Sequence, residues 1–279
     1  MPVYATCYTK SGEQNLSKES RVYGLPGKLT TILMDVTTQE SVDAAVTSVA
    51  KTVGPKGLWA LVNNAGALAR TGVDDWMSVQ DYQDALEVNT LGVIRVTHAF
   101  RPLVKKGGGG RIVTTVSIAG RMPFAGVGPY TVAKHAAGAY CDVLRLEMKH
   151  WGVSCHILEP GFFKTALLDA ETLKRQTRQQ WDALPQRVKD EYGEHCLQWI
   201  LDNTKRHGYD RASDRIELVV NDYVHAITSR FPKPRYSPGY DAKFFFIPVS
   251  MLPTSIMDFV LWLVIELPLR VPVPAALQK

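Results

Sequence analysis

The chain of 279 residues has few of the features that mark several large classes of protein. It has only four cysteines, which lie too far apart for a zinc motif or a redox Cys-x-x-Cys pair, so we expect them to be reduced and mostly buried. None of its seven histidines has a second ligand at a spacing typical of a metal site. The net charge of +5 comes without a basic stripe, which argues against nucleic-acid binding. The four cysteines are Cys7, Cys141, Cys155 and Cys196.

The sequence also lacks a long uninterrupted apolar run. A membrane-spanning helix needs about 20 predominantly apolar residues, and prolines and acidic residues interrupt the most apolar part of the chain, residues 243–279. This pattern favours docking on one face of a bilayer over a transmembrane span. Burial of the same residues in a homodimer is the alternative. The interrupting residues are Pro248, Pro253, Asp258, Glu266 and Pro268.

Strand and helix patterns alternate along the chain, whose length and 46% hydrophobic content suffice for a large core. Residues 29–34 and 58–62 are short apolar runs typical of buried strands, and residues 42–53 carry valines on one helical face. This alternation predicts an α/β fold with a doubly wound parallel sheet. Ligands of such sheets bind beyond the carboxyl ends of the strands. Four candidate residues fall at these ends, namely Asp35, Asn64, Ser117 and Pro160.

Tyr130 and Lys134 are four residues apart, which places both side chains on one face of a helix if a helix begins near Tyr130. A tyrosine titrates near ~10, so it acts as an acid or base at neutral pH only when a nearby positive charge favours the phenolate. Lys134 is placed to supply that charge. Ser117, at the end of the strand-like run 111–116, is placed to hydrogen-bond the oxygen of a substrate.

A single Tyr-x-x-x-Lys pair is unsurprising by chance in a chain with eleven tyrosines. The context favours a catalytic interpretation, because Ser117 ends an apolar run and Pro129 stands where the first turn of a helix tolerates proline. The small residues at 136–138 would let this helix pack closely on a sheet. The pattern therefore predicts a site built for proton transfer to or from a substrate oxygen.

These motifs resemble the short-chain dehydrogenase/reductase family, and within it the retinol dehydrogenase and 17-beta-hydroxysteroid dehydrogenase group. The resemblance extends over nearly the whole chain and implies a Rossmann-like sheet and a nicotinamide cofactor. The motifs that carry it are Asn63-Asn64-Ala65-Gly66, Val88-Asn89-Thr90, Ser117, Tyr130 with Lys134, residues 159–165 and residues 235–239.

The resemblance also implies a role for each matching residue. Ser117, Tyr130, Lys134 and Asn89 would form a catalytic tetrad, in which Asn89 holds a water that connects the lysine to solvent. The implied substrate contacts are Ser117, Tyr130, Phe163 and Trp181. The implied cofactor contacts are Asp35, Val36, Asn64, Ala65, Gly66, Tyr130, Lys134, Pro160, Gly161, Phe163 and Thr165.

Several of these residues also have a purely structural explanation. Asp35 could cap the helix that follows it, and Asn64 could only stabilise a turn. Asn89 is unfavourable inside a helix and so indicates a local kink or a hydrogen-bonding task. Residues 167–232 read as two or three amphipathic helices, which the resemblance implies form a lid over the substrate. Ordinary core packing of these helices, Trp181 included, fits their spacing equally well.

The sequence departs from the family pattern at its start. Residues 3–7 resemble the family's second strand, and the family's first strand, glycine-rich phosphate-binding turn and first helix have no counterpart. We therefore expect a truncated form of a longer enzyme, whose sheet has a gap or a direct and strained pairing where the first strand would lie. The expected organisation is an incomplete dinucleotide-binding core at 1–165, substrate-lid and closing elements of the same domain at 166–242, and the apolar tail.

The expected function is hydride transfer between a nicotinamide cofactor and a hydrophobic alcohol or ketone of the steroid or retinoid type. A hydroxybutyrate dehydrogenase has much the same pattern, and a non-catalytic remnant that associates with membranes or partners is the alternative from a different class. The resemblance favours NAD over NADP, although residues 7–10 offer no acidic side chain for the ribose hydroxyls. It also implies the surface of the endoplasmic reticulum or another intracellular membrane, whereas a truncated chain that stands alone is expected in the cytoplasm.

Overall fold

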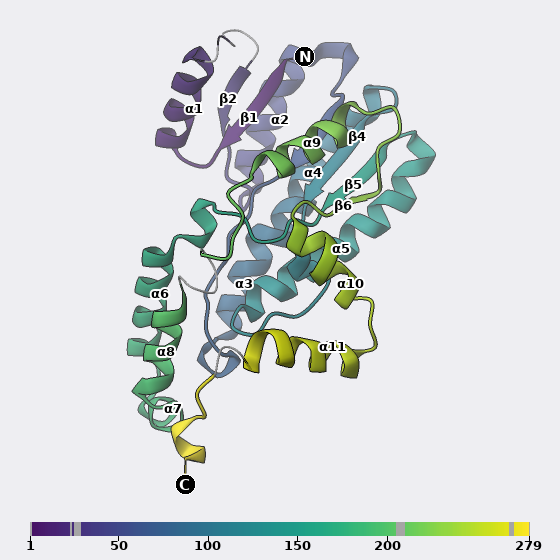
Figure 1. The fold of residues 1–279 in the computed structure, drawn as a ribbon. Coiled ribbons are helices and arrows are strands. Elements are labelled where there is room, and N and C mark those ends of the chain that lie inside the picture. Colours follow the sequence, from purple (N-terminus) through teal and green to yellow (C-terminus); the bar gives the residue numbers. More distant parts are fainter. Residues whose placement is uncertain (1, 23, 25–28, 205–209, 268–270, 279) are drawn as a thin grey trace.

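The computed structural model describes residues 2–22, 24, 29–204, 210–267 and 271–278. In its first part, strands and helices alternate along the chain (Figure 1). Its elements are β1 Val3–Cys7, α1 Lys10–Val22, β2 Leu29–Leu33, α2 Gln39–Val53, β3 Ala60–Asn63, α3 Val79–Leu86, α4 Gly92–Lys106, β4 Arg111–Thr115, α5 Gly128–Met148, β5 Ser154–Leu158, α6 Ala170–Ala183, α7 Gln186–Tyr192, α8 Glu194–Thr204, α9 Glu217–Thr228, β6 Arg235–Tyr236, α10 Ile247–Val249 and α11 Thr254–Leu261.

All strand pairings between these elements are parallel, which confirms the predicted α/β class. Among the described residues the strands form two sheets, one of β1 and β2 and one in the order β3, β4, β5, β6. No hydrogen-bonded ladder joins β1 to β3 in this part of the chain. Of the two arrangements expected from the sequence, the structure therefore has the gap and not the direct pairing.

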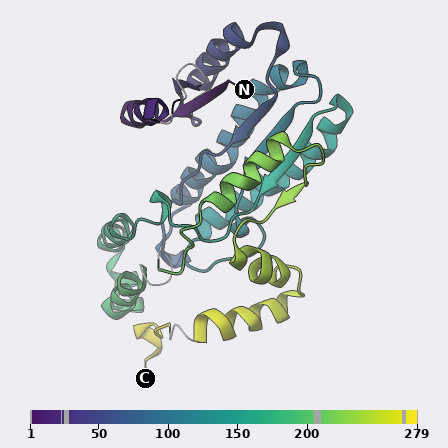
Figure 2. The same ribbon diagram turned by 45° about the horizontal axis from the view of Figure 1, so that its top comes forward.

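Helices cover both faces of the larger sheet (Figures 1 and 2). α9 lies on one face of β4 and β5, and α4 and α5 lie on the other. Successive residues of a strand point to opposite faces, and so Ile112 packs in the core with α4, while its neighbour Val113 packs against α9. Both residues are at most 1% exposed. The strands of this sheet are therefore apolar on both sides, as a doubly wound sheet requires.

α6, α7 and α8 form a separate layer, the lid, beside the loop that precedes α3. Trp181 of α6 packs edge-on against Trp76 of that loop, with ring centroids 5.0 Å apart. Leu197 of α8 completes their hydrophobic cluster. The predicted amphipathic helices are thus present, and their apolar faces pack on one another and on the loop.

The C-terminal elements cross below the sheet in Figure 1 and pack on the loop after β4. Phe246 and Val249 share a hydrophobic cluster with Ile118 and Met122 of that loop. Residues 243–265 therefore belong to the packed molecule. In the part of the chain that the structure describes, no helix is long and apolar enough to cross a bilayer.

Candidate active site

Tyr130 and Lys134 lie in the first two turns of α5, on the face that packs into the protein. The helix begins at Gly128, and Pro129 occupies its first turn as the sequence predicts. Tyr130 is 9% and Lys134 3% exposed, and the Lys134 Nζ lies 5.5 Å from the centroid of the Tyr130 ring. Nζ donates a hydrogen bond to the Thr115 carbonyl oxygen at 3.1 Å. The spacing of four residues thus places phenol and ammonium on the same side of the helix.

Ser117 follows β4 directly and joins this pair. Its hydroxyl lies close enough to Tyr130 to favour the phenolate, and its Oγ accepts a hydrogen bond from the Ala119 amide at 3.1 Å. The next residue, Ile118, donates its amide to the Pro160 carbonyl oxygen at 3.1 Å, which ties this loop to the turn after β5. The ends of two neighbouring strands therefore fix the position of the serine hydroxyl.

Burial governs the titration of both groups on α5. It raises the pKa of Tyr130 above its usual range, and the nearby Ser117 hydroxyl opposes that rise. Burial also lowers the pKa of Lys134 from 10.5 to about 8. In this structure the pKa of Tyr130 is thus raised overall, contrary to the expected lowering by Lys134, because desolvation of the phenolate is the largest effect.

Asn89 lies in a π-helical segment, Glu87–Leu91, between α3 and α4. Its amide group is fully buried and bonded on both sides: Nδ2 donates to the carbonyl oxygens of Ala67 and Ala85, and Oδ1 accepts from the Ala67 amide. Of the kink or hydrogen-bonding task predicted from a helical asparagine, the hydrogen-bonding task is confirmed, and it coincides with a local π turn of the helix. Single π turns of this kind are frequent at functional sites.

The loop after β3 approaches Asn89 and Lys134 through Gly66. A Cβ added to Gly66 would lie 3.1 Å from Asn89 Oδ1 and 3.4 Å from Lys134 Nζ. The preceding Asn64 and Ala65 are exposed at the end of the strand. The buried ammonium of Lys134 has one carbonyl partner among the described residues, and Gly66 leaves a narrow approach to it. The hydroxyl groups of a nicotinamide ribose fit this place, because their oxygens would supply the further acceptors that an ammonium takes.

Asn64 has an additional partner that the sequence did not reveal. Its Oδ1 accepts a hydrogen bond of 2.6 Å from the hydroxyl of Tyr223, which also contacts the hydroxyl of Thr115. Tyr223 lies on α9, more than a hundred residues further along the chain. No local motif marks it, because only the packing of α9 on β4 brings it to this strand end.

Asp35 and Val36 follow β2, at the end of the smaller sheet. The Asp35 Oδ1 accepts hydrogen bonds from the amide of Thr37 at 2.8 Å and from its hydroxyl at 2.7 Å. Asp35 thus forms a local turn before α2, whose N-cap is Thr38, and does not cap that helix as the structural alternative held. The side chain of Val36 lies against Gly92, where a Cβ would come within 2.8 Å of it. Val36 therefore joins the smaller sheet to α4.

The turn after β5 contains the remaining predicted cofactor residues. Gly161 lies so close to Asp241 that a Cβ would overlap the carboxylate, and the same carboxylate accepts a hydrogen bond from the Phe162 amide at 2.8 Å. Phe163 is 5% exposed and packs under α9, whereas Thr165 is exposed at the start of the lid. Of the predicted cofactor residues Pro160, Gly161, Phe163 and Thr165, Thr165 is thus the most exposed.

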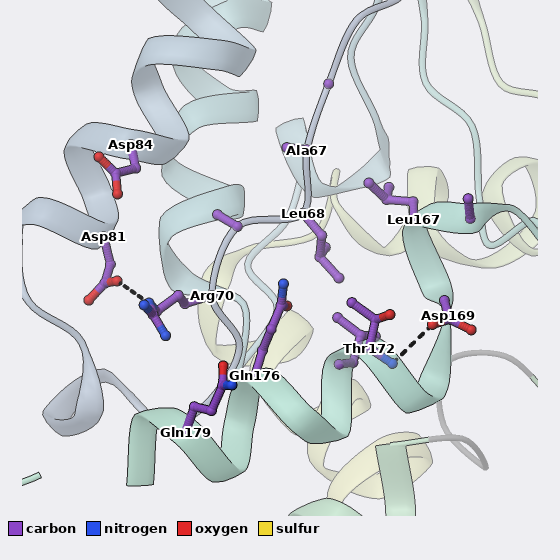
Figure 3. A pocket seen from close by; sticks show the side chains of 14 residues that line it. Ala67, Leu68, Arg70, Asp81, Asp84, Leu167, Asp169, Thr172, Gln176 and Gln179 are labelled. Carbon is purple, nitrogen blue, oxygen red and sulfur yellow. Dashed lines mark hydrogen bonds and ion pairs between the residues drawn. The ribbon is translucent and has the colours of Figure 1, made fainter. Parts of the chain in front are cut away.

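A cavity of about 580 Å³ opens beside this site, between the loop after β3, α3 and α6 (Figure 3). It begins at Gly66, the residue that approaches Lys134. Phe163 and Trp181 do not line it within the described part of the chain, and both lie in hydrophobic clusters. For Trp181 this arrangement matches the core-packing alternative. The cavity is lined by Gly66, Ala67, Leu68, Ala69, Arg70, Asp81, Asp84, Ala166, Leu167, Asp169, Thr172, Leu173, Gln176 and Gln179.

The sequence carried one signal for this cavity that was not used. Asp169, Leu173, Gln176 and Gln179 recur at intervals of three or four, so they share one face of α6. The Asp169 side chain caps the helix by accepting a hydrogen bond of 2.9 Å from the Thr172 amide. A polar stripe of this kind on a lid helix marks a face that is turned toward water or a ligand.

The chain is similar over most of its length to known dehydrogenases. It is 45% identical over 272 residues to the 3beta-hydroxysteroid dehydrogenase dhs-16 of Caenorhabditis elegans, covering 93% of this chain and 67% of the relative. It is 40% identical to the 17-beta-hydroxysteroid dehydrogenase type 6 of Homo sapiens, covering 93% of this chain and 79% of the relative. Retinol dehydrogenase 16 of Rattus norvegicus is 41% identical, with 92% and 79% covered.

Solved structures share the fold at lower identity. A short-chain dehydrogenase from Streptomyces avermitilis superimposes with a TM-score of 0.65 at 22% identity, covering 96% of this chain and 89% of that chain. The family model for short chain dehydrogenases matches residues 3–176, the segment that contains Asn64, Asn89, Ser117, Tyr130 and Lys134. On this evidence, the chain belongs to the short chain dehydrogenase family.

Proposed function

We propose that this protein transfers a hydride between a nicotinamide cofactor and a hydrophobic alcohol or ketone of the steroid or retinoid type. The relatives named above are hydroxysteroid and retinol dehydrogenases, which supports this substrate class. NAD is the cofactor we favour, on the same likeness. The cofactor supplies the hydride chemistry, and the protein supplies orientation and proton transfer.

The observation that carries the proposal is the meeting of three side chains at one strand end. Tyr130 lies close to Ser117 and beside the ammonium of Lys134. In the proposed reaction the Tyr130 hydroxyl exchanges a proton with the substrate oxygen, while Ser117 donates a hydrogen bond to that oxygen. Lys134 holds the nicotinamide ribose. Asn89 holds the loop at Ala67 and supports the water relay to Lys134.

The substitution Tyr130→Phe tests this assignment, because it removes the hydroxyl and keeps the ring. We expect oxidation of a hydroxysteroid or of retinol to fall about 100- to 10,000-fold, with the cofactor Kd little changed. Tyr192→Phe is the matched control. The hydroxyl that it removes belongs to α7, away from α5, and donates a hydrogen bond to Asp75 of the loop before α3. Undiminished turnover in Tyr130→Phe would exclude Tyr130 as the proton donor.

Calorimetric titration of the purified chain with NADH and with NADPH tests the cofactor and separates the enzyme from a non-catalytic remnant. Micromolar binding with turnover supports the enzyme, and a lower Kd for NADPH would overturn the preference for NAD. Absence of binding to either cofactor would support the remnant. Assays with a short hydroxy acid such as hydroxybutyrate decide the remaining alternative, because efficient turnover of that substrate would contradict the apolar class.

A further inference from the structure

Four charged side chains form a continuous ion network that starts next to the Ser117 loop. Glu159, at the end of β5, is 1% exposed, and its Oε1 accepts a hydrogen bond of 2.7 Å from the Nε of Arg121. One terminal nitrogen of Arg235, on β6, donates to the same oxygen, and the other donates to Asp142 of α5. Because Arg235 contacts both carboxylates, the network joins the loop after β4, the ends of β5 and β6, and α5.

Two members of this network belong to the segments that carry the proposed proton-transfer groups. Arg121 directly follows the 3₁₀ turn Ile118–Gly120, whose N-cap is Ser117. Asp142 lies about three turns beyond Tyr130 on the same helix, α5. The ion pairs therefore connect the segment that holds the serine hydroxyl with the helix that holds the phenol.

The backbone on either side of Glu159 is already bonded to the backbone on either side of Ser117. The amides of the two residues that flank Ser117 donate hydrogen bonds of 2.8 and 3.1 Å to the carbonyl oxygens of the two residues that flank Glu159. The amide of Glu159 itself donates to the Tyr236 carbonyl oxygen at 2.8 Å. The Arg121 guanidinium adds a bond from the far end of the 3₁₀ turn, so that the turn is held at both of its ends.

Stability alone is a poor explanation for burying this carboxylate. Its second oxygen, Oε2, is buried and has no hydrogen-bond partner in the part of the chain that the structure describes. Desolvation offsets most of the Coulomb attraction in a buried ion pair, and apolar residues of similar volume often stabilise a fold as well or better. What an ion pair adds over apolar packing is a defined direction, because the planar guanidinium binds an acceptor only along its N–H bonds.

We propose that the Arg121–Glu159 ion pair positions the Ser117 hydroxyl beside the Tyr130 phenol, with Arg235 as the link between Glu159 and α5. This inference rests on the proposed function, in which the serine and tyrosine hydroxyls share the substrate oxygen. Both arginine and glutamate act through other residues and contact neither substrate nor cofactor in this role.

Arg121→Met tests the pair, because it removes the bond to the turn while Arg235 still neutralises Glu159. We expect kcat for a hydroxysteroid to fall roughly tenfold, since a small displacement of a reacting group is costly, with the cofactor Kd unchanged. Arg121→Lys keeps the charge and should recover most of this loss. Arg187→Met is the matched control, because it removes an arginine that forms an ion pair of 2.6 Å with Glu191 on α7, away from the network.

A double-mutant cycle with Ser117→Ala separates positioning from a general loss of stability. A variant that only unfolds more easily would lower kcat by the same factor whether or not the serine hydroxyl is present. If the ion pair acts through that hydroxyl, Arg121→Met should lower kcat little further once Ser117 is alanine. Losses in kcat that multiply would overturn the proposal.

A measurement without turnover keeps this inference distinct from the proposed function. Tyrosine labelled with carbon-13 at Cζ gives a resonance for Tyr130, assigned by its loss in Tyr130→Phe. We expect Ser117→Ala and Arg121→Met to shift this resonance in the same direction. An unmoved resonance in Arg121→Met would overturn the positioning role. Shifted resonances with kcat unchanged in both variants would instead overturn the proposed proton transfer and leave the positioning in place.

Discussion

Lys134 is an ionisable group that folding removes almost completely from water. Its pKa falls from 10.5 to about 8 because burial penalises the ammonium form. Between these two pH values the unfolded chain binds more protons at this position than the folded one, so stability rises with pH across that interval. Below pH 8 the cost of the buried charge is present in full. The protein thus retains at α5 a residue that weakens its own fold.

The substitution Lys134→Met tests this cost. At pH 7 we expect urea unfolding to show a gain in the free energy of unfolding on the order of 3 kcal/mol, together with loss of dehydrogenase activity. The gain should shrink as the pH is raised toward 10. Lys51→Met, on the exposed side of α2, is the control for loss of a lysine as such. A stability difference that is absent at pH 7, or constant with pH, would contradict this account.

Single residues of the site differ in how far the sequence reveals them. Tyr130, Lys134 and Ser117 were predicted together, because helical spacing and a strand end are local properties. Asn89 was predicted to disturb its helix, since its propensity conflicts with its position. Tyr223 was missed, because its role depends on a contact with the end of β3 that the chain makes only after folding.

At the scale of elements, the turn after β5 depends on the absence of a side chain at Gly161. Its contact with Asp241 leaves no room for a Cβ, and the same carboxylate holds the Phe162 amide. We expect Gly161→Ala to lower the free energy of unfolding by about 1–3 kcal/mol. Thermal or urea unfolding measures this loss.

A double-mutant cycle identifies the cause of that loss. Asp241→Ala should be destabilising by itself because the Phe162 amide loses its acceptor, and it should make Gly161→Ala less costly because the overlap is gone. If the effects of the two substitutions on the free energy of unfolding were additive, the loss in Gly161→Ala would not come from overlap with Asp241. Gly12→Ala, within α1, is the control for the added methyl group. Gly126→Ala is unsuitable, because Gly126 has a φ of 83°.

The positions of most central elements could be predicted from their patterns, because strands buried on both sides are apolar runs with clear ends. β3 and β4 begin and end within two residues of the predicted runs 58–62 and 111–116. The environment of the lid could not be predicted, since an amphipathic helix fits a ligand and a neighbouring helix equally well. Trp76, which packs against Trp181, lies in a loop with no pattern of its own.

For the whole molecule, α11 and the turn that follows it are apolar on two sides. Met257, Val260 and Ile265 pack toward the protein, whereas Phe259 and Leu263 are 59% and 47% exposed. We propose that the exposed side docks on one leaflet of a bilayer. Burial between two copies of the chain is the alternative.

Sedimentation with phospholipid vesicles tests this docking. We expect Phe259→Glu and Trp262→Glu to reduce the bound fraction several-fold, because each places a charge on the apolar side. Phe231→Glu is the matched control, since Phe231 is 77% exposed but follows α9. An unchanged bound fraction would contradict docking through α11, and a shift from dimer to monomer in light scattering would support the alternative.

The division into two sheets has a consequence for how the molecule opens. α1 has no fully buried residue, and β1 and β2 pair only with each other in the described part of the chain. Regions with few buried contacts unfold locally at a lower free energy than the core. We therefore expect the amide hydrogens of residues 3–22 and 29–33 to exchange with deuterium as one cooperative unit, well before those of β4 and α5. Thermal fluctuations would then loosen the Asp35 and Val36 end of the proposed cofactor site while Tyr130 and Lys134 stay in place, so that dinucleotide affinity would be lost on heating before the proton-transfer geometry.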